Sequence, residues 1–227
     1  MADRPAFVFD LDGTLVDSVY QHVLAWQEAL EVAGIELAVW RIHRRIGMSG
    51  GLFAGALLRE TGRPVDAVMV TELQRAHAEA YRRHAGRVRL LPGAHQLLQH
   101  LSSLGVPWGV ATSGLLEAAR PTLELLQVPA EVPVVTRDEV AHAKPDPDLF
   151  LAAAQRLGVD ITDAVVVGDS VWDLLAARRA RALGVGLLAG GYGQDELERA
   201  GAYRVYEDPA DLLAHLDEVG VRTPHSA

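Results

Sequence analysis

The stretch FVFDLDGT, residues 7–14, places two carboxylates one residue apart at the end of an apolar run. Two like charges this close repel each other, so they need a compensating partner or one of them must stay protonated. Side chains at positions i and i+2 of a strand point to the same side, so Asp10 and Asp12 can converge if the chain stays extended. Gly13 permits a sharp turn directly after them. Taken alone, such a pair is more often a loop or a cap than a catalytic site.

Other small or charged residues follow further apolar runs or lie between them. They are Thr112, Ser113 and Gly114 after WGVA, Lys144 in HAKPDPDLF, and Asp169 and Asp173 after AVVVG. Ligands of open α/β sheets bind outside the carboxyl ends of the strands, so we expect these residues to face one crevice. Each also has a plain alternative. Asp169 could cap a helix, Thr112 could be a strand-end hydroxyl, and Lys144 could be solvated.

The chemistry of these groups favours a magnesium ion and a phosphate. Four carboxylates at one sheet edge make a hard, oxygen-rich cavity, and we expect them all to be metal ligands: Asp10, Asp12, Asp169 and Asp173. Because the chain has no cysteine, Mg²⁺ is the favoured cation, completed by waters and a substrate phosphate. The Lys144 ammonium would neutralise a phosphoryl group or Asp10, while Thr112 and the amides of Ser113 and Gly114 could hold a phosphate oxygen.

The elements that must position these groups are short apolar strands alternating with helices. Strands are expected at 6–9, 106–112, 132–136, 164–168 and 184–189, and helices at about 93–105, 115–127, 146–158 and 170–184. Runs without polar alternation suit a parallel sheet that is covered on both faces. The pattern therefore predicts an α/β fold with a doubly wound, Rossmann-like parallel sheet.

One interval breaks this alternation. Between Leu11 and Val106 we expect no strand, only helices at about 18–33, 37–46, 50–61 and 66–84. The interval is too long for one crossover, so we interpret 16–87 as an inserted α-helical cap domain, with residues 1–15 and 88–227 as the core. A lid hinged beside a site is the natural function of such an insertion, and a merely decorative subdomain is the alternative.

Composition excludes several classes of function. The net charge of −9 argues against nucleic acid as a partner, and the absence of cysteine excludes disulfides and thiolate catalysis. The N-terminal residues lack the layout of a signal peptide, and no apolar stretch approaches the roughly 18 residues of a membrane helix. We expect a cytoplasmic protein with no membrane partner, as a monomer or a homodimer.

In combination, the motifs resemble those of the haloacid dehalogenase-like hydrolase superfamily, in the phosphatase branch with a helical cap after the first strand, which includes the phosphoglycolate phosphatase and β-phosphoglucomutase types. DLDGT (10–14), VATSG (110–114), AKPDPDLF (143–150) and VVGDSVWD (166–173) match the four family motifs in order and spacing, and the resemblance covers nearly the whole chain. The resemblance implies these roles: nucleophile Asp10, acid/base Asp12, phosphate-binding Thr112, charge-stabilising Lys144, magnesium ligand Asp169 and its neighbour Asp173. Asp12 points to phosphate chemistry, because the dehalogenase members lack the second aspartate.

The implied function is Mg²⁺-dependent hydrolysis of a small phosphorylated metabolite. Asp10, ionised, would attack phosphorus and form an aspartyl-phosphate. Asp12, protonated, would give its proton to the leaving alkoxide and later take one from water. Two alternatives stay open. One is a phosphomutase of the β-phosphoglucomutase type, and the other is a non-catalytic metabolite-binding protein on the same scaffold, against which the intact motifs argue.

Residues of the insertion supply the weaker signals. His22 could face the cleft and contact substrate or simply pack, and its spacing to Trp26 resembles the first cap helix of β-phosphoglucomutase. Arg45, in the basic stretch WRIHRRIG, could grip a second anionic group or form part of a solvated helix face. In the mutase an arginine follows the Gly-x-Ser turn, where this chain has Gly50. The glycine-rich AGGYGQDEL (189–197) is interpreted as a mobile turn before a helix rather than a phosphate loop.

Overall fold

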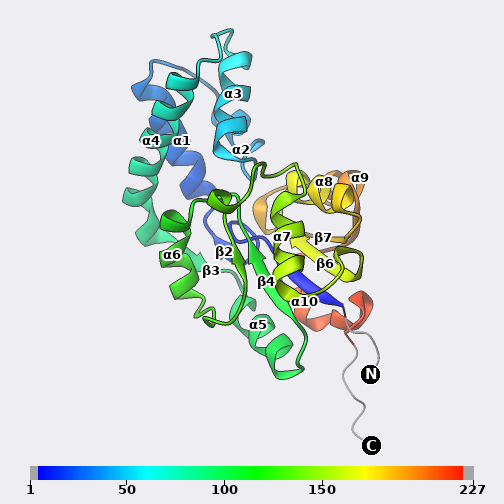
Figure 1. The fold of residues 1–227 in the computed structure, drawn as a ribbon. Coiled ribbons are helices and arrows are strands. Elements are labelled where there is room, and N and C mark those ends of the chain that lie inside the picture. Colours follow the sequence, from blue (N-terminus) through cyan, green and yellow to red (C-terminus); the bar gives the residue numbers. More distant parts are fainter. Residues whose placement is uncertain (1–4, 222–227) are drawn as a thin grey trace, which may run out of the picture.

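The computed structural model describes residues 5–221, in which a six-stranded parallel sheet is flanked by helices (Figure 1). The strand order is β5-β4-β1-β6-β7-β8. The strands are β1 (Ala6–Phe9), β4 (Trp108–Ala111), β5 (Val134–Val135), β6 (Ala164–Gly168), β7 (Leu183–Leu187) and β8 (Ala202–Tyr206). The helices of this part are α5 (Ala94–Ser103), α6 (Leu116–Leu125), α7 (Asp148–Leu157), α8 (Val171–Ala180), α9 (Gln194–Ala200) and α10 (Pro209–Ala214). The predicted α/β fold with a Rossmann-like sheet is confirmed.

Side-chain alternation along β1 explains why helices cover both faces of the sheet. Phe7 and Phe9 are fully buried in an apolar cluster that includes side chains of α5 and α10. Val8 points the other way and is buried in a second cluster with residues of α7 and α8. A central strand that is apolar on both sides has to be covered on both sides, because its exposure would leave a whole row of apolar side chains in water.

The register of the sheet brings the expected functional residues level with one another. Phe9, the last residue of β1, lies opposite Val110 of β4 and Val167 of β6. The residues that follow these three strands therefore emerge together at the carboxyl edge of the sheet, where ligands of this fold class bind.

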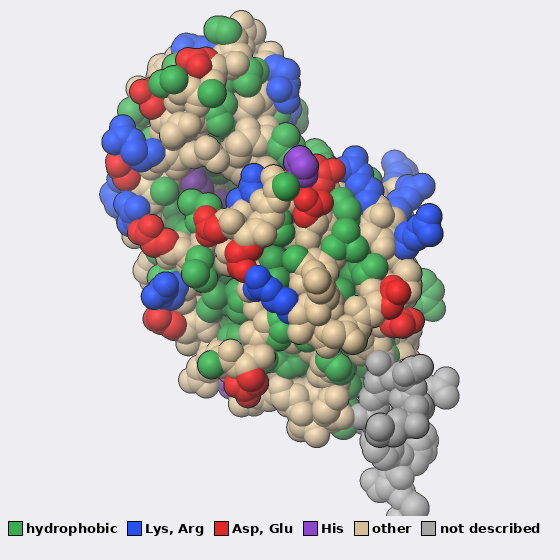
Figure 2. All heavy atoms as spheres, in the orientation of Figure 1, with side chains coloured by type: hydrophobic (Ala, Val, Ile, Leu, Met, Phe, Trp, Pro, Cys, Tyr) green, Lys and Arg blue, Asp and Glu red, His purple; other side chains and the backbone are tan. Residues whose placement is uncertain are grey.

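Four helices lie between β1 and β4: α1 (Val19–Val32), α2 (Val39–His43), α3 (Gly50–Glu60) and α4 (Ala67–His84). Figure 1 shows them beyond the carboxyl edge of the sheet, with α1 alongside α4. They share an apolar cluster of their own, whose buried members all come from residues 19–73, and Figure 2 shows this part as a separate lobe. The boundaries of the cap domain at 16–87 stay a prediction. No helix within residues 5–221 has the length and apolar character needed to cross a membrane.

The structure also contains strands that the sequence pattern did not indicate. The two-residue strands β2 (Val16–Asp17) and β3 (Arg89–Leu90) pair antiparallel where the helical segment leaves and rejoins the sheet, although we expected no strand between Leu11 and Val106. The edge strand β8 was also missed, because its sequence AYRVY is partly exposed and lacks an unbroken apolar run. Short 3-10 turns occupy Ala85–Arg87, Arg137–Glu139, Ile161–Asp163, Leu188–Gly190 and Leu216–Val219.

Candidate active site

The two aspartates that follow β1 point to different partners. Asp10 is buried and its carboxylate accepts a hydrogen bond from the Lys144 ammonium. The Asp12 carboxylate instead accepts a hydrogen bond from the Ser18 hydroxyl at 2.6 Å and lies 3.3 Å from Nε2 of His22. Both aspartates line one pocket, but the Asp12 carboxylate is not part of the acidic cluster that contains Asp10, and the chain turns directly after it at Gly13, whose φ is +83°.

Three buried carboxylates gather beside this turn. Oxygens of Asp10, Asp169 and Asp173 lie within 4.8 Å of one another. Asp173 also lies 2.8 Å from Nζ of Lys144 and accepts hydrogen bonds from the amide and hydroxyl of Ser170. The Asp12 side chain, expected as a fourth ligand, is not part of this cluster. The structure therefore brings together three of the four carboxylates that the sequence suggested.

The acidic cluster has less positive charge around it than its carboxylates need. Burial, only partly offset by Lys144, raises the pKa of Asp10 to about 7. Burial and then the charges of Asp173 and Asp10 raise the pKa of Asp169 well above its ordinary value. Burial would lower the pKa of Lys144, but the charges of Asp10 and Asp173 raise it, so the lysine stays protonated. One ammonium for three clustered carboxylates is a donor set that suits a divalent cation with oxygen ligands.

Asp12 behaves in the opposite way. Its burial would raise its pKa, but His22 and Ser18, both within hydrogen-bonding distance, hold the pKa of Asp12 below its ordinary value. Asp12 is therefore an ionised carboxylate at neutral pH, although we expected it to be protonated and Asp10 to be ionised. The difference arises because at Asp10 burial and the neighbouring carboxylates outweigh Lys144, whereas at Asp12 the interactions with His22 and Ser18 outweigh burial.

Glycines allow the backbone to close tightly around Asp169. A Cβ atom on Gly190 would lie 1.8 Å from Oδ2 of Asp169, and one on Gly13 would lie 2.5 Å from the same atom. The Thr14 hydroxyl donates to the other oxygen of Asp169 at 3.1 Å. Gly190 belongs to the segment that we interpreted as a mobile turn. The segment is a turn before α9, as interpreted, and within it Gly190 packs on Asp169 while its carbonyl lies 2.8 Å from Nε2 of His43.

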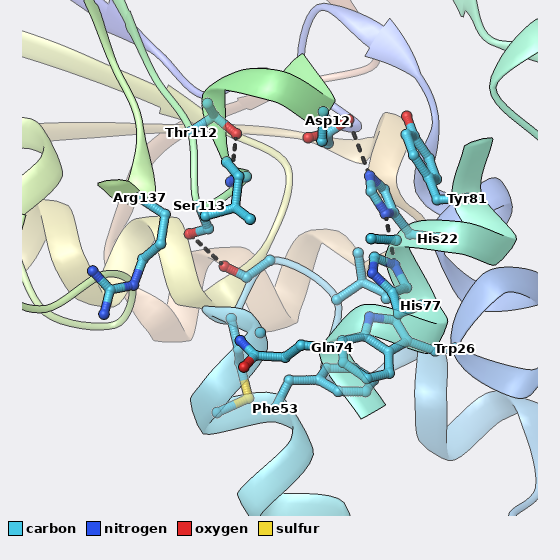
Figure 3. A pocket seen from close by; sticks show the side chains of 18 of the residues that line it. Asp12, His22, Trp26, Phe53, Gln74, His77, Tyr81, Thr112, Ser113 and Arg137 are labelled. Carbon is cyan, nitrogen blue, oxygen red and sulfur yellow. Dashed lines mark hydrogen bonds and ion pairs between the residues drawn. The ribbon is translucent and has the colours of Figure 1, made fainter. Parts of the chain in front are cut away.

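The loop after β4 forms the opposite side of the site. Thr112 is buried, and its hydroxyl oxygen accepts a hydrogen bond from the amide of Gly114 at 3.0 Å. The Ser113 hydroxyl donates to the carbonyl of Gly47, in the turn between α2 and α3, at 3.3 Å. All three loop residues line one pocket together with Asp10, Asp12 and Lys144 (Figure 3). Asp169 and Asp173, which we expected to face the same crevice, do not line this pocket.

Helices α1, α3 and α4 supply the far wall of the same pocket, and Figure 3 shows its side chains facing Asp12 and Thr112 across the space. His22 lies in this wall and stacks on Tyr81, with ring centroids 4.0 Å apart. Its Nδ1 is 3.2 Å from Nε2 of His77. His22 therefore lines the cleft, which is one of the two positions that the sequence left open for it. The residues of α4 were missed by the sequence reasoning, although Gln74, His77 and Tyr81 have the spacing of one helix face.

The basic residues of the insertion are engaged elsewhere. Arg45 was expected to contact substrate, but it does not line the pocket. Its guanidinium contacts the carboxylate of Glu60, which it shares with Arg41. Arg44 reaches across to Glu196 of α9, at 3.1 Å for one of its two contacts, and lies over the ring of Tyr192. Arg44 and Arg45 are held away from the pocket because each forms an ion pair with a glutamate that is distant in the sequence.

Comparisons with known proteins agree with this geometry. The family model described as haloacid dehalogenase-like hydrolase matches residues 5–181. Hexitol phosphatase A from Escherichia coli (strain K12) is 34% identical over 177 residues, covering 77% of this chain and 78% of that protein. A phosphoglycolate phosphatase from Rhodospirillum rubrum is 32% identical over 216 residues, covering 91% and 88%. The crystal structure of a hydrolase from Pseudomonas syringae has 53% identity and a TM-score of 0.93, covering 96% of this chain and all of that one.

Proposed function

This chain belongs to the haloacid dehalogenase-like hydrolase family, and we propose that it is a Mg²⁺-dependent phosphatase that hydrolyses a small phosphate monoester through an aspartyl-phosphate at Asp10. The observation that carries the proposal is the environment of Asp10. It is a buried carboxylate held by the Lys144 ammonium beside two further carboxylates, at the floor of a pocket that also contains Asp12 and Thr112. A cytoplasmic location is part of the proposal.

In the proposed first step, Asp10 attacks phosphorus while its other neighbours hold the phosphoryl group. The Lys144 ammonium offsets negative charge on the transferring oxygens, and the Thr112 hydroxyl with the loop amides of Ser113 and Gly114 orients them. Asp10, Asp169 and Asp173 would hold the Mg²⁺ ion, which would supply the positive charge that the acidic cluster lacks. The Asp12 side chain would not be among these ligands, because it lies outside the acidic cluster.

Asp12 is placed to handle the protons of both steps. The leaving oxygen of a phosphate on Asp10 would emerge toward the pocket, where Asp12 lies. The carboxylate is ionised in the free protein, so it is ready to accept a proton from water in the second step. For the first step Asp12 has to carry a proton, taken from solvent, which it gives to the leaving oxygen; in the second step it takes one from the attacking water, so a complete turnover returns it to the protonated form. His22, with Nε2 3.3 Å from Oδ1 of Asp12, holds the carboxylate in place.

The phosphomutase alternative receives no support from the cap. A mutase has to hold a second phosphate while the first one is transferred, and Gly50 lines the pocket without a side chain to bind it. We expect that incubation of β-glucose 1-phosphate with a trace of its 1,6-bisphosphate and Mg²⁺ releases inorganic phosphate. Phosphorus NMR that showed glucose 6-phosphate forming faster than inorganic phosphate would favour the mutase instead.

The test of the proposed function is hydrolysis of p-nitrophenyl phosphate in the presence of Mg²⁺ by three proteins. The wild type should be active, and Asp10→Asn should lose turnover because an amide is a far weaker nucleophile. Asp163→Asn is the matched control, because Asp163 is exposed and precedes β6 at the opposite edge of the sheet. An active Asp10→Asn enzyme would refute the assignment of the nucleophile.

A further inference from the structure

A line of close polar contacts leads from Asp12 into the cap helices. Nε2 of His22, on α1, lies 3.3 Å from Oδ1 of Asp12, and Nδ1 of the same ring lies 3.2 Å from Nε2 of His77, on α4. Figure 3 marks both contacts, which follow one another across the pocket wall. All three residues line the pocket. One intervening ring therefore connects His77 to the group that we assign to proton transfer.

The direction of these hydrogen bonds follows from the Asp12 carboxylate. The Ser18 hydroxyl donates to the same Oδ1 atom at 2.6 Å, so this oxygen acts as an acceptor. Nε2 of His22 must therefore be the donor in its contact with Oδ1. A neutral imidazole has hydrogen on one nitrogen only, so Nδ1 of His22 is an acceptor and Nε2 of His77 donates to it.

Both contacts to the Asp12 carboxylate are made to one of its two oxygens. The residues of 5–221 form no hydrogen bond or ion pair with its Oδ2 atom. Oδ2 is therefore the oxygen on which Asp12 can carry the proton for the leaving group. In the other tautomer of His22, Nε2 would be an acceptor and would draw that proton to Oδ1, where the ring rather than the substrate would hold it.

Neighbouring aromatic rings hold both histidines. His77 stacks on Trp26 with ring centroids 4.3 Å apart, and His22 stacks on Tyr81 with an angle of 4° between the ring planes. Enclosure in the wall, and then the neighbouring His22, lower the pKa of His77 well below its ordinary value, so His77 is neutral. The plain alternative for His77 is packing, which needs a flat ring but not its nitrogen atoms.

We propose that His77 is a positioning residue for Asp12: its Nε2–H fixes the tautomer of His22 that holds Oδ1, so that Oδ2 carries the transferable proton. The inference rests on the proposed phosphatase function and adds a residue to it. In the first step the Oδ2–H bond breaks, and its proton goes to the ester oxygen as the bond from that oxygen to phosphorus breaks. In the second step a water proton returns to Oδ2 while the water oxygen bonds to phosphorus and the bond from phosphorus to Asp10 breaks. Both histidines keep their hydrogens throughout.

The test uses two aryl phosphates of similar shape whose leaving groups differ in basicity. Phenolate is more basic than p-nitrophenolate, so its release depends more on the proton from Asp12. In His77→Phe, which keeps a flat ring, we expect kcat/KM with Mg²⁺ to fall about tenfold for phenyl phosphate and about twofold or less for p-nitrophenyl phosphate. His77→Gln should stay within about threefold of the wild type on both esters, because its amide places an N–H group near the position of Nε2. Equal losses on the two esters in His77→Phe, or no loss on either, would overturn the inference.

A double variant shows whether His77 acts through His22. His22→Phe should lower kcat/KM for phenyl phosphate, and adding His77→Phe should cause little further loss, because the link is already broken. Additive losses would contradict the proposed line of contacts. His84→Phe is the matched control on α4 and should resemble the wild type, since Nε2 of His84 lies 2.6 Å from Glu28 and His84 does not line the pocket. If thermal unfolding shows that His77→Phe is not folded, His77→Met replaces it in both comparisons.

A measurement that needs no turnover tests the order of the hydrogen bonds. ¹⁵N NMR of the histidine-labelled wild type at about pH 8, assigned by comparison with His22→Phe, should show hydrogen on Nε2 of His22 and none on Nδ1. Hydrogen on Nδ1 would overturn the inference whatever the activity. If the wild type with Mg²⁺ hydrolyses neither aryl phosphate, the phosphatase proposal itself is wrong, and the NMR result still decides on the tautomer. If it hydrolyses p-nitrophenyl phosphate but not phenyl phosphate, the proposed function stands and the inference about the position of Asp12 is overturned.

Discussion

Replacement of Lys144 by methionine should destabilise the protein strongly. The Lys144 side chain is completely buried, and its ammonium contacts the carboxylates of both Asp10 and Asp173. Methionine keeps most of the volume but removes the only charge that these contacts supply. Breaking a buried ion pair in this way costs about 3–5 kcal/mol, because the remaining charge is left uncompensated. For a chain of this size, that loss lowers Tm by on the order of 10 °C.

The size of the effect should depend on pH and on Mg²⁺. Burial already raises the pKa of Asp10 to about 7, and loss of Lys144 raises it further. A carboxyl whose pKa is raised in the folded state binds more protons when folded, so its destabilising effect develops as the pH rises through that pKa. The difference between wild type and Lys144→Met should therefore be larger at pH 8 than at pH 5. Added Mg²⁺ should reduce it at pH 8, because the ion compensates the same carboxylates.

The measurement is urea unfolding of both proteins in EDTA and in Mg²⁺, with Arg179→Met as the control. Arg179 also forms an ion pair, with Asp146 at 3.0 Å, but its side chain is 51% exposed. Exposed pairs contribute at most about 1 kcal/mol, so this variant should resemble the wild type. If Lys144→Met lost no more free energy of unfolding than Arg179→Met, our description of the buried charge cluster would be incorrect.

Three further predictions concern the metal, the tight backbone and a histidine. Exhaustive chelation with EDTA should abolish hydrolysis of p-nitrophenyl phosphate, and added Mg²⁺ should restore it. Ca²⁺ should be a poor substitute, because its coordination shell is larger and more flexible. Full activity in EDTA would refute the metal site. Gly190→Ala should lower kcat about 100-fold, because its methyl group would displace Asp169. Gly86→Ala is the control, because a Cβ at Gly86 meets open space. Equal kcat values for the two variants would contradict the role given to Gly190. The pKa of His77 is lowered in the folded state, so below about pH 6.5 the imidazole is protonated in the unfolded chain but not in the folded one. The free energy of unfolding should therefore fall with decreasing pH, by up to about 1.4 kcal/mol per pH unit. His77→Gln should show a shallower fall between pH 6.5 and 5.5 in urea unfolding, and an unchanged slope would count against a neutral His77.

The core of the site was predictable from the sequence because it depends on short-range rules. Apolar runs predicted where the strands end, and the parallel arrangement brings those ends to one edge. Asp10 accordingly lies both in a pocket with Thr112 and Lys144 and in an acidic cluster with Asp169 and Asp173. These positions follow from local sequence patterns and from one property of the fold class.

What the sequence did not predict depends on contacts between distant segments. Arg45 pairs with Glu60, and nothing in the spacing of WRIHRRIG indicates that partner. The direction of Asp12 depends on a turn at Gly13 and on a hydroxyl from Ser18, which precedes α1 but does not cap it with its side chain. The packing of Gly190 on Asp169 joins two loops that only the finished sheet brings together.

The signal for the far wall was used for α1 but missed for α4. His22 and Trp26 lie four residues apart on α1, and Gln74, His77 and Tyr81 share one face of α4. Polar and aromatic residues at helical spacing are also common in ordinary cores, so this pattern gains its meaning only when both helices are seen to border the pocket.

The most direct test of the central claim is to trap the covalent intermediate. In Asp12→Asn, the group that activates water for the second step is absent, while p-nitrophenyl phosphate needs little help with its leaving group in the first. Brief incubation of this variant with p-nitrophenyl phosphate and Mg²⁺, followed by acid quenching and peptide mass spectrometry, should show one added phosphoryl group, on Asp10. A phosphoryl group on another residue, or p-nitrophenol released by this variant without any phosphorylated peptide, would contradict the proposed mechanism.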